Sequence, residues 1–401
     1  MESLYEETLE RYRKFVMPTY APKILFVRGQ GTRLWDADGR EYLDFATGIS
    51  VCNLGHCHKG VTSAIQKQAE TLVHVSNLYM NGVMPRLAEK LIENCFDGVV
   101  FFCNSGAEAN EGMFKFARKI GNKSGRNEII SMDNSFHGRT LATLAATGRA
   151  KYRKGFEPDM PGFKQVPFND FDALKGAITP KTCAVVLEPV QGEGGVLPAN
   201  REYLQKVRSL CDEKNILLLF DEVQCGTGRI GTRYAWQSFG VEPDALSMAK
   251  AIANGLPMGA LIVKRKYAET LTVGTHASTF GGTPLVSAAA LAVQEAFDRE
   301  NVLENCQLTG EYLRENLAQI GQKYPFVKEV RGMGLMIGVV LDREAATLAG
   351  LCLKQNLVVL TAGETVLRLL PPLNLTRAEA DEGLKRIGVA LEELNSIIQK
   401  G

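Results

Sequence analysis

The chain has 401 residues, of which 45% are hydrophobic and 23% are charged, and 46 basic residues almost balance 45 acidic ones. This length suffices for two domains, and the composition is ordinary for a globular protein. A formal charge of +1 argues against a nucleic-acid partner, and no apolar run approaches the length of about 18 residues that predicts a membrane span.

The N-terminal segment is charged and has helical spacing, without the apolar core of a signal peptide. Nine cysteines are scattered without a CxxC pair, which is typical of reduced thiols. Both features predict a cytoplasmic protein. Next in the chain, a small meander is expected, with strands at Ile24–Arg28, Arg33–Asp36 and Tyr42–Phe45.

The middle of the chain alternates short apolar runs with helical patterns. Strands are expected at Val99–Phe102, Glu128–Met132, Cys183–Leu187, Ile216–Phe220, Ala245–Met248 and Ala260–Val263. Helices are expected between most of them, for example at Glu108–Ile120 and Glu202–Lys214. This alternation predicts an α/β fold with a mostly parallel sheet that is covered by helices.

After about residue 290 the pattern changes to long helices and further short strands. The strands are expected at Val327–Arg331, Leu335–Leu341, Leu357–Leu360 and Val366–Leu369, before a final helix from Thr376. We therefore predict a large domain over residues 49–290. Residues 1–48 and 291–401 are expected to form a second, small α+β domain together.

The ends of two strands in the large domain carry the most informative pair of residues. One apolar run stops at Asp221, and Lys250 stands alone among small and apolar residues at the end of the next strand. Separately, such a lysine is usually a surface residue and such an aspartate is usually a cap. As a pair they match the needs of pyridoxal phosphate, because a lysine forms a Schiff base with its aldehyde and a carboxylate keeps its pyridine nitrogen protonated.

Other segments after strands could hold the rest of such a cofactor and its substrate. Ser105, Gly106 and Ala107 open a helix, where N–H groups can bind a phosphate, although Ser105 with Glu108 also matches a plain helix cap. A second glycine-flanked loop carries Thr279. The remaining candidates are an aromatic ring, an arginine and two acids that follow strands, namely Phe136, Arg139, Glu188 and Glu193, whereas His137 is interpreted as a packed loop histidine.

Two motifs are set aside. Gly226–Gly231 matches GxGxxG, but it does not directly follow a strand and no acid ends the next strand, so a dinucleotide site is not expected. Cysteines and histidines also gather in a short segment whose spacing fits no common zinc site, so no metal is expected there: Cys52, His56, Cys57 and His58.

Together these motifs resemble the class III pyridoxal-phosphate aminotransferases over essentially the whole chain. The resemblance runs through residues 104–110, 135–140, 188–195, 220–224, 248–250, 278–282 and 368–373. It implies the type I fold of pyridoxal-phosphate transferases, with a sheet of the seven-stranded type. It also implies transfer of the terminal amino group of N-acetylornithine, or of a similar ω-amine, to 2-oxoglutarate in arginine biosynthesis.

The resemblance further implies roles for residues at the cofactor. Lys250 binds the cofactor and shuttles the proton, Asp221 pairs with the ring nitrogen, Gln224 reaches the ring hydroxyl, and Phe136 stacks on the ring. Glu222 and Val223 belong to the same cofactor-binding set. The phosphate is held by Ser105, Gly106 and Ala107 together with Thr279 of the partner subunit, which implies a homodimer with shared active sites.

On the substrate side, the resemblance implies that Arg139, Ser278 and Arg368 contact the amino acid. Glu193 pairs with an arginine and moves aside for glutamate. The donor stays open, because a related ω-transaminase could act on ornithine, succinylornithine, 4-aminobutyrate or a bulky non-natural amine, and an aminomutase would need no oxo acid. The chain departs from the family pattern at Lys59, at Ile230 and in residues 81–84. Two hypotheses follow: a wider pocket for the acyl group of the donor, or a change that stabilises the fold.

Overall fold

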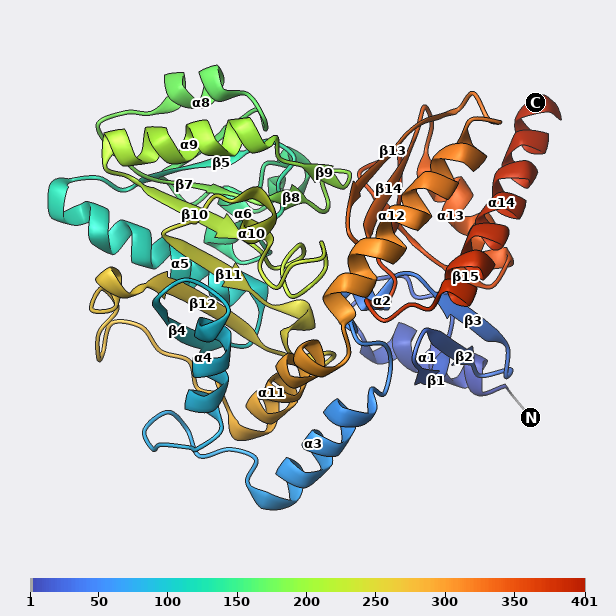
Figure 1. The fold of residues 1–401 in the computed structure, drawn as a ribbon, viewed down its shortest axis with the longest axis horizontal. Helices are drawn as coiled ribbons and strands as arrows, with labels where there is room; N and C mark the ends of the chain where they lie inside the picture. The colour runs from blue at the N-terminus through green and yellow to red at the C-terminus, as the bar shows by residue number, and fades with distance from the viewer. Residues whose placement is uncertain (1–2, 401) are drawn as a thin grey trace.

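The computed structural model describes residues 3–400, and within them a seven-stranded sheet forms the centre of the molecule (Figure 1). Its strands, in spatial order, are β4 (Gly98–Cys103), β12 (Gly259–Lys264), β11 (Ala245–Met248), β10 (Leu217–Asp221), β7 (Thr182–Leu187), β5 (Glu128–Met132) and β6 (Phe163–Val166). In this sheet β12 runs antiparallel to both neighbours, while the pairs β11–β10, β10–β7, β7–β5 and β5–β6 are parallel. The predicted α/β fold with a mostly parallel sheet is confirmed.

Helices cover this sheet and extend below it. They are α3 (Lys59–Thr71), α4 (Met84–Glu93), α5 (Gly106–Gly121), η1 (Asn122–Ser124), α6 (Leu141–Ala146), α7 (Ala150–Arg153), α8 (Phe171–Ala177), α9 (Arg201–Lys214), α10 (Ala235–Phe239), η2 (Lys250–Ala253), η3 (Arg265–Tyr267) and α11 (Pro284–Arg299). Among the residues that the structure describes, no helix combines the length and apolarity needed to cross a membrane.

Strand β10 explains why the central apolar runs are unbroken. Leu217 and Leu219 belong to a buried cluster with side chains of α5, whereas Leu218 and Phe220 belong to the cluster that contains side chains of α9. Successive side chains of a strand point to opposite faces of the sheet. Because helices cover both faces, every position from Leu217 to Phe220 must be apolar.

Two four-stranded sheets lie beside the central sheet (Figure 1). One joins β1 (Phe26–Gln30), β2 (Arg33–Asp36), β3 (Glu41–Asp44) and β15 (Leu357–Val358), and the other joins β13 (Val327–Met333), β14 (Met336–Leu341), β17 (Val366–Leu369) and β16 (Leu360–Ala362). The surrounding helices are α1 (Leu4–Phe15), α2 (Thr47–Ser50), α12 (Val302–Gly321), α13 (Ala345–Lys354) and α14 (Arg377–Lys400), and a short hairpin pairs β8 (Val190–Gln191) with β9 (Leu197–Pro198).

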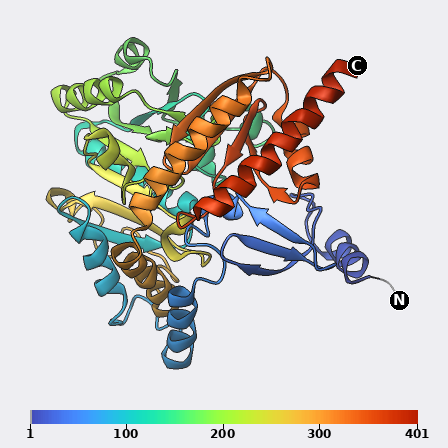
Figure 2. The same ribbon diagram turned by 45° about the vertical axis from the view of Figure 1, so that its right-hand side comes forward.

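The two ends of the chain meet in this region. Strand β15 pairs in parallel with β3, and Arg33 of β2 binds Glu382 of α14 through Nη2 and Oε2 at 2.6 Å. Figure 2 shows the red helix α14 beside the blue N-terminal strands. These contacts support our proposal of a small domain built from residues 1–48 and 291–401 and a large domain over residues 49–290, although residues 1, 2 and 401 lie outside the described part of the chain.

Two details of the strand assignment differ from expectation. The single strand expected at Leu357–Leu360 is wrong, because β15 and β16 belong to different sheets. Strand β6 was not expected, because it lies at the edge of the central sheet and carries the polar residues Lys164 and Gln165. Edge strands need less apolar surface than central strands, so their pattern is weaker.

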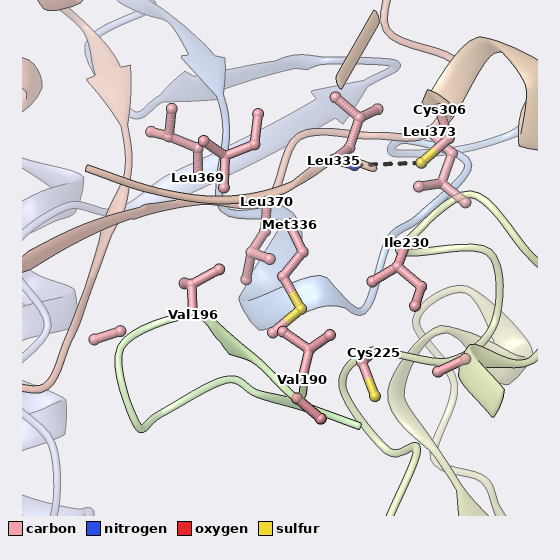
Figure 3. Close-up of a cluster of buried hydrophobic side chains, with 14 of the residues drawn as sticks. Val190, Val196, Cys225, Ile230, Cys306, Leu335, Met336, Leu369, Leu370 and Leu373 are labelled. Carbon is pink, nitrogen blue, oxygen red and sulfur yellow. Dashed lines mark hydrogen bonds between the residues drawn. The ribbon is translucent and has the colours of Figure 1, made fainter. Parts of the chain in front are cut away.

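A buried apolar cluster connects the loops of the central sheet with β14 and β17 (Figure 3). Its labelled side chains are Val190, Val196, Cys225, Ile230, Cys306, Leu335, Met336, Leu369, Leu370 and Leu373. The Leu335 N–H donates a hydrogen bond to Cys306 Sγ at 3.3 Å. Ile230, which departs from the family pattern, is therefore a core residue between the two parts of the molecule.

Candidate active site

A cavity of about 430 Å³ opens at the carboxyl ends of the central strands. Its lining includes Ser105–Ala107 after β4, Phe136 after β5, Glu188 after β7, Asp221 at the end of β10 and Lys250 after β11. Parallel strands end at one edge of a sheet, so residues distant in sequence meet there. The expectation that these segments converge is confirmed by the fold.

The Asp221 carboxylate is buried and accepts hydrogen bonds from several sides. Its partners are Asn110 Nδ2 at 2.7 Å, His137 Nδ1 at 2.7 Å, Val223 N at 3.0 Å and Ser247 Oγ at 3.4 Å. This network fixes the orientation of the carboxylate, as a partner for a protonated ring nitrogen requires.

His137 has a larger part in this network than the sequence indicated. Burial lowers the pKa of His137, but the hydrogen bond with Asp221 and the charges of Asp221 and Glu188 together outweigh burial, and the net pKa is raised. Its Nε2 is buried without a hydrogen-bond partner among residues 3–400, as is Asn110 Oδ1. The interpretation of His137 as only a packed loop histidine is therefore wrong, because it binds the acid of the predicted pair.

Lys250 begins the short helix η2 directly after β11 and lines the same cavity. Its φ of 51° lies in the left-handed region, which is uncommon for a lysine. Burial lowers the pKa of the Lys250 amine, and the charges of Asp221 and Glu193 offset only part of this effect. An amine with a lowered pKa is more often neutral and is a better nucleophile toward an aldehyde.

The N-terminus of α5 forms another wall of the cavity. Ser105 Oγ accepts a hydrogen bond from Glu108 N at 3.2 Å, so Ser105 is the helix cap that one interpretation predicted. Gly106 lies beside it on the cavity wall, and a Cβ on this glycine would come within 2.8 Å of Val223 Cγ1. The start of the helix can therefore face an anion as well, because its first N–H groups point out of the helix.

The chemical groups that line this cavity match those of pyridoxal phosphate. The cavity offers helix N–H groups for a phosphate, an oriented carboxylate for a ring nitrogen, an amine of lowered pKa for an aldehyde, and the Phe136 ring for stacking. Each group lies on a different strand end, and all of them border one space.

A buried ion pair lies beside this cavity. Arg368 Nη1 donates to Glu193 Oε1 at 2.6 Å and to Gln224 Oε1 at 2.9 Å, and Gln224 itself lines the cavity. Burial alone raises the pKa of Glu193, but the Arg368 guanidinium outweighs burial and lowers the pKa below its usual value. Arg139 is exposed at the cavity wall, where its guanidinium lies 3.9 Å from the centre of the Tyr152 ring.

Three predicted site residues lie elsewhere in the chain's own structure. Ser278 and Thr279 border a separate cavity of about 270 Å³, and Ser278 Oγ accepts from Asn104 Nδ2 at 3.3 Å. The Glu222 carboxylate turns away and accepts from Ala235 N at 2.6 Å and from Trp236 N at 2.8 Å. A role for the Glu222 side chain at the cofactor is therefore wrong, and Ser278 does not reach the cavity of its own chain.

Sequence reasoning missed Asn110 and Ser247, which hold Asp221. Asn110 is a polar residue on the buried face of α5, and Ser247 is the polar residue of the apolar strand β11. A buried polar side chain needs a partner, so a polar residue that interrupts an apolar face was a usable signal.

Glu188, which was predicted from the sequence, is buried at the cavity. It accepts a hydrogen bond from Phe136 N at 2.9 Å, and burial raises its pKa to about 7.

Comparisons with known proteins agree with this geometry. A family model described as Aminotransferase class-III matches residues 16–391. An acetylornithine aminotransferase of Methanocaldococcus jannaschii is 48% identical, covering 98% of this chain and 99% of that protein. A succinylornithine transaminase/acetylornithine aminotransferase of Pseudomonas aeruginosa is 46% identical over 96% of both.

A solved structure of the ornithine aminotransferase from Toxoplasma gondii, described with partial occupancy of PLP at its active site, superposes with a TM-score of 0.95. It is 31% identical and covers 98% of this chain and 95% of that one. The family match over most of the chain agrees with the fold and with the pair of Asp221 and Lys250 at the strand ends. We conclude that this chain belongs to the class III aminotransferases, which are pyridoxal-phosphate-dependent transaminases.

Proposed function

We propose that this enzyme transfers the terminal amino group of N-acetylornithine, or of a similar ω-amine, to 2-oxoglutarate, with a semialdehyde and glutamate as products. The observation that carries the proposal is the cavity where Lys250 and Asp221 meet beside the Arg368–Glu193 pair. The names of the relatives support an N-acylated ornithine as the donor. The cysteine pattern supports a cytoplasmic location.

Pyridoxal phosphate, when bound, supplies a carbon that accepts the amine and a ring that accepts electrons. Ser105–Ala107 would bind its phosphate, Phe136 would orient its ring, and Asp221 would hold a proton on the ring nitrogen. The Lys250 amine would take the proton from the donor carbon that bears the amino group. Acid–base catalysis of this kind contributes about 10²–10⁴-fold.

Arginines bind the carboxylates of both substrates. Arg139 is accessible at the cavity wall, whereas Arg368 is covered by Glu193 at 2.6 Å. We infer that Arg139 binds the donor carboxylate, and that Glu193 leaves Arg368 when 2-oxoglutarate or glutamate brings a second carboxylate. Because Arg368 lowers the pKa of Glu193, the Glu193 carboxylate is charged near neutral pH.

We further propose a homodimer with shared active sites. Leu78 and Met80 are 87% and 99% exposed, and they lie near the loop of Thr279, because Asn77 Nδ2 donates to Ser278 O at 3.0 Å and to Gly281 O at 2.9 Å. Contiguous exposed apolar side chains mark interaction surfaces. Covering this surface with a second copy would let Thr279 of the partner subunit complete the phosphate site.

The first experiment is a panel of amine donors, with and without 2-oxoglutarate, in which glutamate formation is measured. We expect acetylornithine to have the highest kcat/KM and no turnover without the oxo acid. Product without an oxo acid would instead indicate an aminomutase, and preference for ornithine or 4-aminobutyrate would overturn the proposed donor.

A second experiment locates the cofactor. Borohydride reduction followed by peptide mass mapping should place the cofactor adduct on Lys250, and the control variant Lys266→Ala should keep the adduct on Lys250.

The dimer is tested by co-expressing Lys250→Ala and Thr279→Ala chains. A mixed dimer with shared sites has one site with a native Lys250 and a native Thr279, so about a quarter of all sites regain full activity at equal expression. Activity that equals the average of the two separate variants would contradict shared sites. Sedimentation of the wild-type enzyme checks the dimer independently.

A further inference from the structure

Glu193 lies in a loop whose backbone is held on both sides of it. Gly192 donates its N–H to Glu188 Oε2 at 3.1 Å. Gly195 O accepts from Arg331 Nε at 3.0 Å and from Arg331 Nη2 at 2.8 Å. When the Glu193 carboxylate moves, it therefore moves by rotation about its side-chain bonds while the backbone stays in place.

A second arginine, Arg149, contacts the same loop. Its Nη2 donates a hydrogen bond to Glu193 O, its Nε donates to Asn134 O at 3.4 Å, and its Nη1 donates to Tyr152 Oη at 3.4 Å. All three acceptors are uncharged oxygen atoms. Among residues 3–400, Arg149 forms no ion pair, whereas Arg368 is paired with Glu193 at 2.6 Å. Arg149 is therefore a guanidinium beside Glu193 that has no carboxylate partner.

Binding of a dicarboxylate takes away the present partner of Glu193. In the proposed function, on which this inference rests, 2-oxoglutarate or glutamate places one carboxylate on Arg139 and the other on Arg368. The Glu193 side chain is only 24% exposed, and a largely buried carboxylate without a cation is unfavourable. The displaced carboxylate therefore needs another cation close to its loop.

The cations around Glu193 leave one candidate for this role. Burial raises the pKa of Glu193, and the charges of Arg368, Lys250 and Arg149 oppose burial and lower it. In the complex with a dicarboxylate, Arg368 is occupied by the substrate, and Lys250 serves the cofactor. Arg149 remains, and its guanidinium already reaches the backbone of Glu193.

We propose that Arg149 is the second partner of the Glu193 carboxylate, which pairs with Arg368 while a monocarboxylate is bound and with Arg149 while a dicarboxylate is bound. Arg149 is thus a positioning residue that lets one site accept both kinds of substrate. Because it stabilises only the state in which Arg368 is free, it strengthens the binding of dicarboxylates and not that of monocarboxylates.

Binding is measured with glutarate, a dicarboxylate with the carbon chain of 2-oxoglutarate, and with pentanoate, the matching monocarboxylate. Neither acid has an amino or oxo group, so neither is transaminated. Inhibition constants are obtained from the donor half-reaction of the holoenzyme without 2-oxoglutarate, with the fastest donor of the panel, followed through the absorbance of the cofactor. In Arg149→Gln we expect the constant for glutarate to rise about 10-fold and that for pentanoate to stay within about 2-fold.

Two further variants are controls for this measurement. Arg149→Lys keeps a cation and should weaken glutarate less than Arg149→Gln does. Arg153→Gln makes the same change in helix α7, but Arg153 Nη1 binds Gln165 Oε1 at 3.1 Å, so both constants should stay within about 2-fold of the wild type. A rise for glutarate in Arg153→Gln as large as in Arg149→Gln would overturn the proposal.

A second background separates the proposed role from a merely structural one. Glu193→Gln removes the charge that Arg149 would receive, so adding Arg149→Gln to this variant should change the constant for glutarate by less than about 2-fold. If Arg149 only held the loop, its replacement would weaken glutarate equally in both backgrounds. That result, or equal losses for glutarate and pentanoate, would refute the proposal.

Arg368→Gln distinguishes this proposal from the proposed function, and it should weaken glutarate strongly. If Arg368→Gln weakens glutarate and Arg149→Gln does not, the role of Arg149 is refuted while that of Arg368 stands. If glutarate binds to Arg368→Gln as tightly as to the wild type, the assignment of Arg368 fails, and the role of Arg149 fails with it.

Discussion

Asp221 and Glu222 are neighbours in the chain, yet their carboxylates have different surroundings. The Asp221 carboxylate faces the cavity and is hydrogen-bonded to the side chains of Asn110 and His137. The Glu222 carboxylate faces the opposite way and accepts hydrogen bonds from the first N–H groups of α10. Alternation along an extended chain separates the two side chains. The chemistry of each acid therefore depends on the face on which it lies.

Asp221→Asn should lower kcat/KM by at least about 10- to 100-fold, because the amide keeps the shape of the carboxylate but cannot balance a protonated ring nitrogen. Steady-state kinetics with the preferred donor measure this loss. Glu222→Gln is the matched control, since it makes the same change one residue away and should stay within about 3-fold of the wild type. Equal losses in both variants would contradict the assignment of Asp221.

Glu222 also predicts a pH dependence of stability. Burial raises its pKa to about 8, above the ordinary value of 4.5. Between these values the folded protein binds more protons than the unfolded chain, so the free energy of unfolding falls as pH rises from about 4.5 to about 8. In Glu222→Gln this decline should be less steep by up to about 1.4 kcal/mol per pH unit. Urea unfolding at pH 5 to 8 measures both slopes, and parallel slopes would argue against the raised pKa.

At the scale of elements, the site depends on close contacts between a strand and a loop. Gly259 begins β12 beside the loop that leads into α5, and a Cβ there would lie 2.3 Å from Ser105 O.

The segment 81–84 is held by local hydrogen bonds, because Asn81 Oδ1 accepts from Val83 N at 3.1 Å and from Met84 N at 2.8 Å at the start of α4. This geometry supports a stabilising role there, and a wider acyl pocket stays a hypothesis.

Gly259→Ala should displace the Ser105 loop and weaken cofactor binding by about 10-fold, since one unfavourable contact of about 1.4 kcal/mol has this effect. Cofactor loss during dialysis, followed by absorbance, measures it. Gly388→Ala in α14 is the matched control, because a Cβ there meets nothing within 4 Å. Alanine should instead stabilise that helix slightly. If Gly259→Ala retained the cofactor like Gly388→Ala, the contact would be unimportant.

At the scale of the whole molecule, Arg229 connects the parts of the fold. It lies in the GxGxxG segment that was set aside as a dinucleotide motif, and it is fully buried. Its Nε donates to Ser50 Oγ at 2.8 Å, and its Nη1 donates to Leu335 O at 3.0 Å and to Pro371 O at 2.6 Å. Burial lowers the pKa of Arg229 to about 10, so it remains charged near neutral pH.

Arg229→Met should lower the free energy of unfolding by at least about 3 kcal/mol, because the carbonyls of Leu335 and Pro371 would be buried without donors. Chemical denaturation with matched m-values measures the change. Arg11→Met removes an exposed i,i+4 partner of Glu7 and should stay within about 0.5 kcal/mol of the wild type. A comparable small change in Arg229→Met would show that the connection is not needed for stability.

The fold was largely predictable because its signals are local. Apolar runs indicated the strands up to one or two residues, as at β5 and β11, which match expectation. The edge strand β6 was missed because it has polar residues. The division between β15 and β16 was missed because one connecting residue, the apolar Val359, leaves no pattern in the sequence.

The sequence by itself determined the α/β architecture and the pairing of an acid with a lysine at adjacent strand ends, since both follow from periodicity and from where apolar runs stop. Only the tertiary structure decided that His137 and Asn110 hold Asp221, that Glu222 turns away, and that Ser278 lies outside the cavity of its own chain. The physical reason is that the direction and partners of a side chain depend on segments far apart in the chain, which meet only after folding.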